Sequence, residues 1–561
     1  MDPTYQDKLD GFSPGSAIML QVPALDFGQT GFATSTDIGA SLASNAPVVL
    51  YDTVTKTNLP YFAELDAQNS DASTKLLLVH PAVNFAEGHR IDVVLRNLKD
   101  SSGNYLGTLA GESAALGGHF TPAARGAHLK YLVTTELKTL DLTHLYVAWD
   151  FTVATGGGDL KKLSAANIAD PALTMRQQAY ALVGKSAPVF TVTNVSVNSN
   201  NERQVEGMFQ VPTFLKNCPA PGGGAYGSTN TASCGSLNAD KNGLPLLVKS
   251  TYSKTTKTWS NQLWANFICV MPQTPGATPA TPAVYGHGLL GNADEVAGGN
   301  FITAVNDFNM MGCATDWAGM SENDLLLVAA SLTNMSTFHV NVEHMLQGML
   351  NAQFLGRLMN SAQGFASNVA FQNNGVSRFA VGKTVYVGYS QGGIMGGATS
   401  ALSNEWSRVV LGQPGLDYGG LLLDRSHDWN EFASVYNPAY PDKTDQQIGL
   451  QLAQLLWDRG ENDGYAEHLT AHPYGGTKAK QVLIIENYGD HQVSPVAAEV
   501  FGRTIGAAAN QPAFNPTYLL DSSVATRDDA TVAFDWNMPT LSHASVVNAA
   551  KIGRASCRER V

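Results

Sequence analysis

The stretch that decides the fold is Gly388-Tyr-Ser-Gln-Gly392, in which a serine stands between two glycines. An apolar run, Thr384–Val387, precedes it, and a run of mostly small residues, Gly393–Ala401, follows it. The first pattern is typical of a buried strand and the second of a closely packed helix. A serine on a sharp strand-to-helix turn needs neighbours without side chains, because its backbone is strained and the turn packs tightly. The sequence therefore predicts an exposed nucleophile, Ser390, at the end of a strand.

A serine hydroxyl becomes nucleophilic when a base takes its proton, and that base needs an orienting carboxylate. Asp490 follows the apolar run Gln481–Glu486, and His543 is the only histidine after His491. We expect Asp490 and His543 to complete a catalytic triad with Ser390. His491 is an alternative base, although its position next to Asp490 makes an Asp–His–Ser geometry awkward. The alternatives to Asp490 as the orienting acid are Asp521, Asp528 and Asp529.

A second glycine-rich stretch, Tyr285-Gly-His-Gly-Leu-Leu-Gly291, also follows an apolar run. Its glycines would let the chain approach a substrate carbonyl closely. We expect the backbone N–H groups of Leu289 and Gln391 to form an oxyanion hole. His287 is interpreted as a histidine that braces this loop. The residues that we expect near the substrate pocket are His287, Tyr389 and Trp317.

Together these motifs resemble those of the α/β-hydrolase serine esterases and lipases, and the layout resembles large exported bacterial lipases with a β-rich N-terminal module. The resemblance covers about residues 205–550. It implies a mostly parallel sheet flanked by helices, with a lid or cap at 413–480. It also implies hydrolysis of small-molecule, lipid or polymeric esters through an acyl-enzyme, without a cofactor or metal. The alternatives are a serine peptidase or amidase of the same fold, an esterase acting on polyesters or acylated polysaccharides and, least favoured, a non-enzymatic binding protein.

Residues 1–155 have a different pattern, in which short runs rich in Val, Ile, Leu and Tyr recur between Gly, Asn, Asp and Pro. This spacing predicts an all-β sandwich, and the stretch 84–104 resembles the end of bacterial immunoglobulin-like modules. The predicted strands are 17–22, 48–51, 61–65, 76–80, 90–95 and 145–153. A linker at Thr155–Gly158 and a helix at Leu173–Val183 occupy 156–204, the connection to the hydrolase-like part.

From 205 onward, apolar strands alternate with segments of helical period, which indicates an α/β fold. The predicted strands are 208–211, 264–271, 283–286, 310–315, 384–388, 408–412, 481–486 and 517–520. Helical spacing is found within 331–362 and at Asp445–Trp457. The basic stretch 551–561 breaks with the rest of the chain and resembles a translated sequencing adaptor, so we expect it to be non-native, with the natural C-terminus missing.

Composition excludes several classes of protein. The chain of 561 residues has a net charge of −13 and only 14% charged residues. A nucleic-acid binder needs basic patches, and a polybasic membrane-surface protein needs clustered Lys and Arg. Apolar runs such as Leu325–Leu332 are strand-sized and shorter than the ~18 residues of a membrane-spanning helix.

The cysteines point to an oxidising compartment. Cys218 and Cys234 flank a loop rich in Pro, Gly, Ser and Asn, and we expect a disulfide between them. Cys269 and Cys313 lie in separate apolar runs and are either buried thiols or a second bridge. The spacing does not suggest a zinc site. The low charge and the expected disulfide favour a secreted or cell-surface protein.

Overall fold

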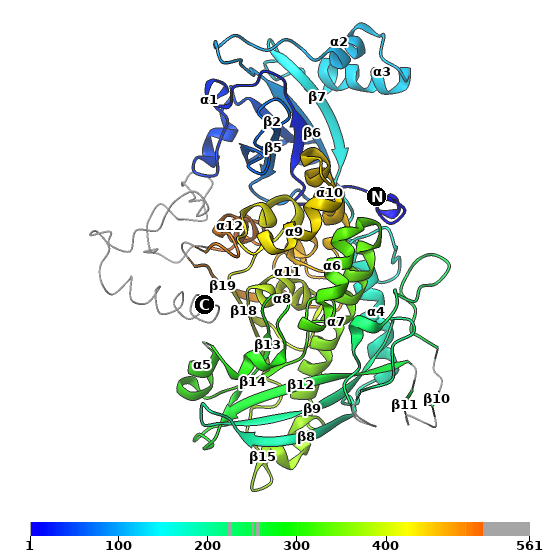
Figure 1. Ribbon diagram of the computed structural model, residues 1–561, viewed down its shortest axis with the longest axis vertical. Coiled ribbons are helices and arrows are strands. Elements are labelled where there is room, and N and C mark those ends of the chain that lie inside the picture. Colours follow the sequence, from blue (N-terminus) through cyan, green and yellow to red (C-terminus); the bar gives the residue numbers. More distant parts are fainter. Residues whose placement is uncertain are drawn as a thin grey trace, which may run out of the picture.

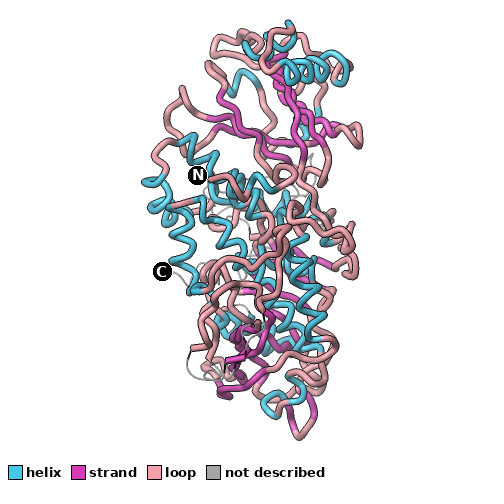
Figure 2. The backbone as a smooth tube through the Cα atoms, turned by 90° about the vertical axis from the view of Figure 1, so that its right-hand side faces the viewer, coloured by secondary structure: helices cyan, strands magenta, loops and turns pink. Residues whose placement is uncertain are grey.

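The computed structural model describes residues 2–222, 227–249, 252–253, 258–259, 261–299, 301–487 and 490–508. Two small antiparallel sheets lie at one end of the molecule, and an eight-stranded sheet with its helices makes up most of the rest (Figure 1). Figure 2 shows the same division from the side, with the strands of the two parts separated by helices and loops.

The N-terminal part is a sandwich of two sheets with the orders β1-β5-β4 and β3-β2-β6-β7. Side chains from both sheets, such as Val79, Leu50 and Val93, share one buried apolar cluster. The observed strands match all six predicted ones closely and add β3; whether the topology is immunoglobulin-like stays a prediction. The strands are β1 Ile18–Gln21, β2 Val48–Asp52, β3 Thr57–Leu59, β4 Tyr61–Leu65, β5 Leu76–Pro81, β6 Arg90–Arg96 and β7 Leu145–Thr152.

Helices also occur in this part, and the strand-like pattern of the sequence does not reveal them. A short helix follows β1, and two helices lie between β6 and β7, where they pack against each other. They are α1 Phe27–Thr30, α2 Ala110–Gly117 and α3 Ala123–Tyr131.

The main sheet has the order β19-β18-β17-β13-β14-β12-β9-β8. Neighbours from β14 to β19 pair in parallel, whereas β12, β9 and β8 pair antiparallel. Every predicted strand of this part is observed except 517–520, which lies outside the described residues; β8 is additional. The strands are β8 Phe190–Val197, β9 Glu202–Pro212, β12 Gln262–Pro272, β13 Thr281–Gly286, β14 Met310–Ala314, β17 Val385–Tyr389, β18 Arg408–Gly412 and β19 Gln481–Ile485. Two short hairpins add β10 Tyr252–Ser253, β11 Thr258–Trp259, β15 Gln372–Asn373 and β16 Val376–Ser377.

Helices cover both faces of the main sheet. Successive residues of one strand face opposite sides, so Cys269 joins one apolar cluster while Val270 joins another, which includes Phe301 and Val305. The helices of this part are α4 Asp170–Val183, α5 Phe301–Phe308, α6 Leu325–Thr333, α7 Phe338–Asn360, α8 Gln391–Leu402, α9 Trp429–Ala439, α10 Lys443–Trp457, α11 Ala466–Leu469 and α12 Pro495–Thr504. None of the helices in the described ranges is long and apolar enough to cross a bilayer.

The strand-sized run Leu325–Leu332 forms helix α6 rather than a strand. Ser321 and Asp324 form a capping box directly before it, in which each side chain bonds the backbone N–H of the other. Such a box satisfies backbone N–H groups at the start of a helix. Local capping therefore favours a helix here, where the apolar periodicity alone does not distinguish a helix from a strand.

The expected Cys218–Cys234 disulfide is confirmed, and Cys269 and Cys313 form a second one. Cys218 is bonded to Cys234, which closes the polar loop between them. Cys269 is bonded to Cys313, and these two residues lie directly opposite each other on the antiparallel strands β12 and β14. The second bridge resolves the alternative that the sequence leaves open.

The two parts of the chain are joined by buried polar contacts. Ser13 Oγ donates to carboxylate oxygens of Asp458 and Asp463, at 2.9 and 2.7 Å. Asn84 Nδ2 donates to Asp463 Oδ1 at 2.7 Å. The expected linker is also held in place, since the N–H of Gly158 donates to Asp170 Oδ1 at 2.7 Å. The N-terminal sandwich is therefore docked on the helical side of the main part.

Candidate active site

Ser390 lies on the sharp turn between β17 and α8. Its backbone has φ 55° and ψ −122°, a conformation that costs a non-glycine residue about 1–3 kcal/mol. The turn is held by the Ser390 N–H, which donates to Gly412 O at 3.0 Å, and by the Ser390 carbonyl, which accepts from the Gly393 N–H at 2.7 Å. Strain of this kind persists only where the surroundings impose it, and it presents the serine at the N-terminus of a buried helix.

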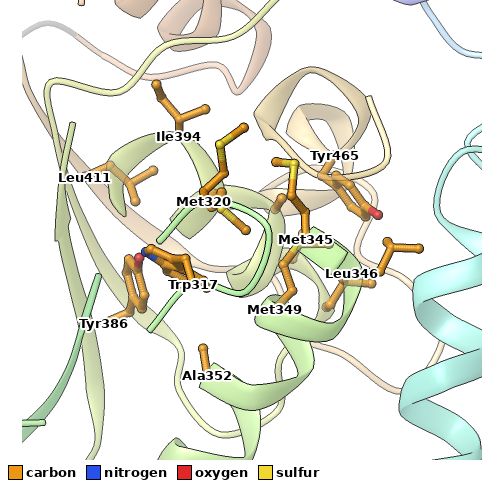
Figure 3. Close-up of a cluster of buried hydrophobic side chains, with 14 of the residues drawn as sticks. Trp317, Met320, Met345, Leu346, Met349, Ala352, Tyr386, Ile394, Leu411 and Tyr465 are labelled. Atoms are coloured by element: carbon orange, nitrogen blue, oxygen red, sulfur yellow. The ribbon is translucent and has the colours of Figure 1, made fainter. Parts of the chain in front are cut away.

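The glycines of the motif are required by close packing. A Cβ atom at Gly388 would lie 2.3 Å from the Gly392 carbonyl oxygen, and one at Gly392 would lie 2.1 Å from a backbone oxygen of the β13 end. The fully buried Tyr386 hydroxyl donates to Gly392 O at 2.6 Å. In Figure 3, Tyr386 lies beside Trp317 among the side chains buried beneath this turn.

A small cavity of about 40 Å³ lies beside Ser390. Leu289 and Gln391, the two predicted oxyanion donors, line it together with the serine. Its other walls come mostly from the segment between β18 and β19, the predicted lid at 413–480. Those lining residues are Tyr418, Leu422, Leu423, Ser426, Asp428, Trp429 and Phe432, joined by Ile394, Gln492 and Val493. The insertion thus covers the candidate nucleophile with mainly apolar side chains.

From Gly288 to Gly291, the loop after β13 leaves one N–H group available. The N–H of Gly288 donates to Glu295 Oε2 at 2.7 Å, that of Leu290 to Met320 O at 3.2 Å, and that of Gly291 to Gly288 O at 3.2 Å. Among the residues that the structure describes, the Leu289 N–H has no acceptor. It therefore remains able to bind an anionic oxygen beside Ser390.

His287 braces this loop, as its sequence context indicates. Its Nε2 accepts from the Trp317 N–H at 2.8 Å, so the proton is on Nδ1, which donates to Gly288 O at 2.8 Å. Both ring nitrogens are thereby occupied and the ring is fully buried. The expected pocket residues His287, Trp317 and Tyr389 are not among the residues that line the cavity at Ser390.

Asp490 lies on the loop beyond β19, at the carboxyl end of the sheet. Its Oδ1 accepts from the N–H groups of Gln492 and Val493, at 2.8 and 3.0 Å, and burial raises its pKa. His543 lies outside the described residues, as do Asp521, Asp528 and Asp529, so its pairing with Asp490 stays a prediction. Within the described ranges, no histidine hydrogen-bonds Ser390, and the alternative base His491 is exposed.

Two polar pairs at the cavity have no signal in the sequence. The Tyr418 hydroxyl donates to the side-chain carbonyl of Gln391, which fastens the insertion to the residue after the serine. Gln492 Nε2 donates to Asp428 at 3.1 Å and links the Asp490 loop to the start of α9. Both pairs join residues far apart in the chain, so only the folded insertion brings them together.

Three buried carboxyl groups lie together elsewhere, at Asp458, Glu461 and Asp463, with one oxygen of each within 4.8 Å of the others. Carboxylate clusters of this kind can hold cations, but protein donors already occupy these oxygens, including Ser13 and Gln454. Burial raises the pKa of all three, that of Glu461 to about 8. The raised pKa values favour protonated carboxyl groups in this cluster.

No protein-family model matches the sequence, and no curated protein matches it significantly. Among solved structures, an acetyl xylan esterase from Paenibacillus sp. is 12% identical over 59% of this chain and 83% of that chain, with a TM-score of 0.32. Acetyl xylan esterase 1 from Thermoanaerobacterium sp. is 13% identical over 58% and 89%, with a TM-score of 0.29. An acylaminoacyl peptidase from Pyrococcus horikoshii is 11% identical over 57% and 43%, with a TM-score of 0.26. Likenesses of this size do not by themselves establish a fold or an activity for this chain.

Proposed function

We propose that the protein is a serine hydrolase of the α/β-hydrolase type that cleaves carboxylic esters, as a carboxylesterase or lipase. The observation that carries the proposal is the strained Ser390 turn, which shares a cavity with the unoccupied Leu289 N–H and with Gln391. A nucleophile at a helix N-terminus facing two backbone donors matches the requirements of acyl transfer.

In the proposed mechanism, Ser390 Oγ attacks the ester carbonyl while His543 takes the hydroxyl proton. The Leu289 and Gln391 N–H groups bind the oxyanion that develops on the carbonyl oxygen. His543 then protonates the departing alcohol, which leaves Ser390 acylated. A water molecule, deprotonated by His543, attacks the acyl group and releases the acid. Asp490 orients His543 and stabilises its protonated form.

The two disulfides support a secreted or cell-surface location, because such bonds persist mainly in oxidising compartments. The apolar walls of the insertion suit the acyl part of a small-molecule, lipid or polymeric ester. Turnover of matched ester and amide substrates separates an esterase from a peptidase or amidase.

The central test is Ser390→Ala assayed with p-nitrophenyl esters from acetate to palmitate. Loss of a serine nucleophile lowers kcat by about 10⁴-fold or more. A fluorophosphonate should label Ser390 stoichiometrically, and His543→Ala should abolish that labelling. Ser407→Ala, a change at an exposed serine, is the matched control and should retain full activity. Undiminished hydrolysis by Ser390→Ala would rule out the proposal.

A further inference from the structure

A second cavity lies apart from the one at Ser390. It has a volume of about 630 Å³, within the ~300–1,000 Å³ range of small-molecule sites, and shares no lining residue with the Ser390 cavity. Its walls come from the N-terminal segment before β1, the segment after the Cys218–Cys234 disulfide, the start of α7 and the residues that follow α10. We call it the lysine cavity, after Lys8, Lys216 and Lys241 in its lining.

The carboxylates that line the lysine cavity have hydrogen-bond partners, whereas the lysine ammonium groups have none among the described residues. Its two carboxylates are already occupied: Glu343 accepts from the Leu237 N–H at 2.7 Å and pairs with His339, and Asp240 accepts from two N–H groups of its own turn. In contrast, none of the three lysine ammonium groups hydrogen-bonds or ion-pairs within the described part of the chain; Lys8 only lies over the Tyr5 ring, at 4.2 Å. With Arg459, the lining therefore holds four basic side chains against two carboxylates, an excess of positive charge in a protein whose net charge is −13.

Arg459 adds a buried donor to the same lining. Its Nη2 donates to Ala165 O at 2.6 Å, whereas its Nε is buried and has no acceptor among the described residues. Burial lowers the pKa of Arg459, whereas the nearby acids Glu343, Asp458 and Asp10 raise it by a smaller amount. A buried donor without an acceptor is rare in proteins and needs an explanation.

The remaining lining is partly apolar. Val342 and Leu346 of α7, Leu456 of α10 and Pro171 of α4 line the cavity alongside the charged residues. An inorganic ion would leave the apolar part of the lining without a contact. A ligand that combines an anionic group with a carbon skeleton can contact both the basic and the apolar parts of the lining.

We propose that the lysine cavity binds an organic carboxylate, with the carboxylate facing the lysines and Arg459 and the carbon skeleton against the apolar lining. This site is separate from Ser390 and does not depend on the proposed esterase activity. Such a ligand has two chemical sources, a carboxylic acid with a hydrocarbon body or an acidic sugar.

The test is isothermal titration calorimetry of the full chain with hexanoate and glucuronate, each beside its uncharged counterpart, hexanamide or glucose. We expect at least one of the two carboxylates to bind when its concentration is raised to about 20 mM. Its affinity should be at least ~10-fold higher than that of its uncharged counterpart. Tighter binding of hexanoate identifies a hydrocarbon acid as the source, and tighter binding of glucuronate an acidic sugar.

The double variant Lys216→Gln/Lys241→Gln removes two exposed charges that have no hydrogen bond or ion pair among the described residues. We expect it to weaken binding at least ~3-fold and to reduce its salt dependence. Lys383→Gln, at an exposed lysine outside the cavity, is the control and should bind as the natural chain does. Absence of binding by both carboxylates, equal binding of the uncharged counterparts, or unchanged affinity in the double variant would each overturn the proposal. Ester hydrolysis by the double variant is measured in parallel, so failure of one proposal leaves the other testable.

Discussion

Replacing Asp458 by Asn should make the protein more stable at neutral pH. Asp458 is buried, and its Oδ1 accepts from Ser13 Oγ and Gln454 Nε2, at 2.9 and 2.8 Å. The neighbouring carboxyl groups of Asp463 and Glu461 also raise its pKa. An asparagine keeps the accepting oxygen and carries no charge, so it mimics protonated Asp458 at every pH.

The sign follows from the pKa of Asp458, which burial and the neighbouring carboxyl groups raise well above 3.8. The folded protein keeps a proton that the unfolded chain loses above about pH 4. This stabilisation is therefore complete below that pH and declines as pH rises, by about 1.4 kcal/mol per pH unit for one proton. The decline ends at the raised pKa of the folded state. Asp458→Asn has no such proton, so its advantage should grow with pH above about pH 4, by up to about 1.4 kcal/mol per pH unit, until the raised pKa of Asp458 is reached.

The assay is urea unfolding, followed by tryptophan fluorescence at pH 5, 6, 7 and 8. An m-value that stays constant across these conditions shows that the same unfolding transition is being measured each time. Asp307→Asn, at an exposed aspartate with no hydrogen bond among the described residues, controls for the change in net charge. Parallel stability curves for Asp458→Asn and the natural chain would refute the reasoning. So would a variant that is less stable at pH 8, because the cluster would then need the Asp458 charge.

Two further predictions concern the Ser390 site. Gly392→Ala should abolish ester hydrolysis and lower Tm, because its Cβ would lie 2.1 Å from a backbone oxygen, whereas Gly107→Ala, with no atom within 4 Å, should leave both unchanged. An active Gly392→Ala enzyme would contradict the geometry of the turn. Trp429→Ala should enlarge the cavity of about 40 Å³ and raise hydrolysis of p-nitrophenyl hexanoate relative to acetate by ~10-fold or more; an unchanged ratio would show that Trp429 does not limit the acyl group.

Features with a local cause were predictable from the sequence. The strand expected at 408–412 is β18, and the helix expected at Leu173–Val183 extends only a few residues further, from Asp170. The turn at Ser390 was predictable for the same reason, since strand, glycines and helix are contiguous and their steric demands are short-range.

Features that depend on contacts between distant residues were not predictable. The cavity walls Tyr418 and Trp429 meet Ser390 only through the fold of the insertion. The roles of Ser390, Asp490 and His543 stay predictions, since His543 lies outside the described residues.

The N-terminal sandwich takes part in holding the insertion over Ser390. Glu64, at the end of β4, forms an ion pair with Arg425, whose Nη1 donates to Leu421 O at 3.4 Å, next to cavity residues Leu422 and Leu423. Arg425 and His80 lower the pKa of Glu64 to about 2, so this contact remains ionic at neutral pH. In this pair the Arg425 side chain is buried and the Glu64 side chain is partly exposed. Movement of the insertion away from the serine at this point would separate the pair and leave the buried Arg425 charge without its partner, unless the sandwich moved with the insertion. Through this ion pair, the N-terminal sandwich constrains the insertion that lines the candidate active site.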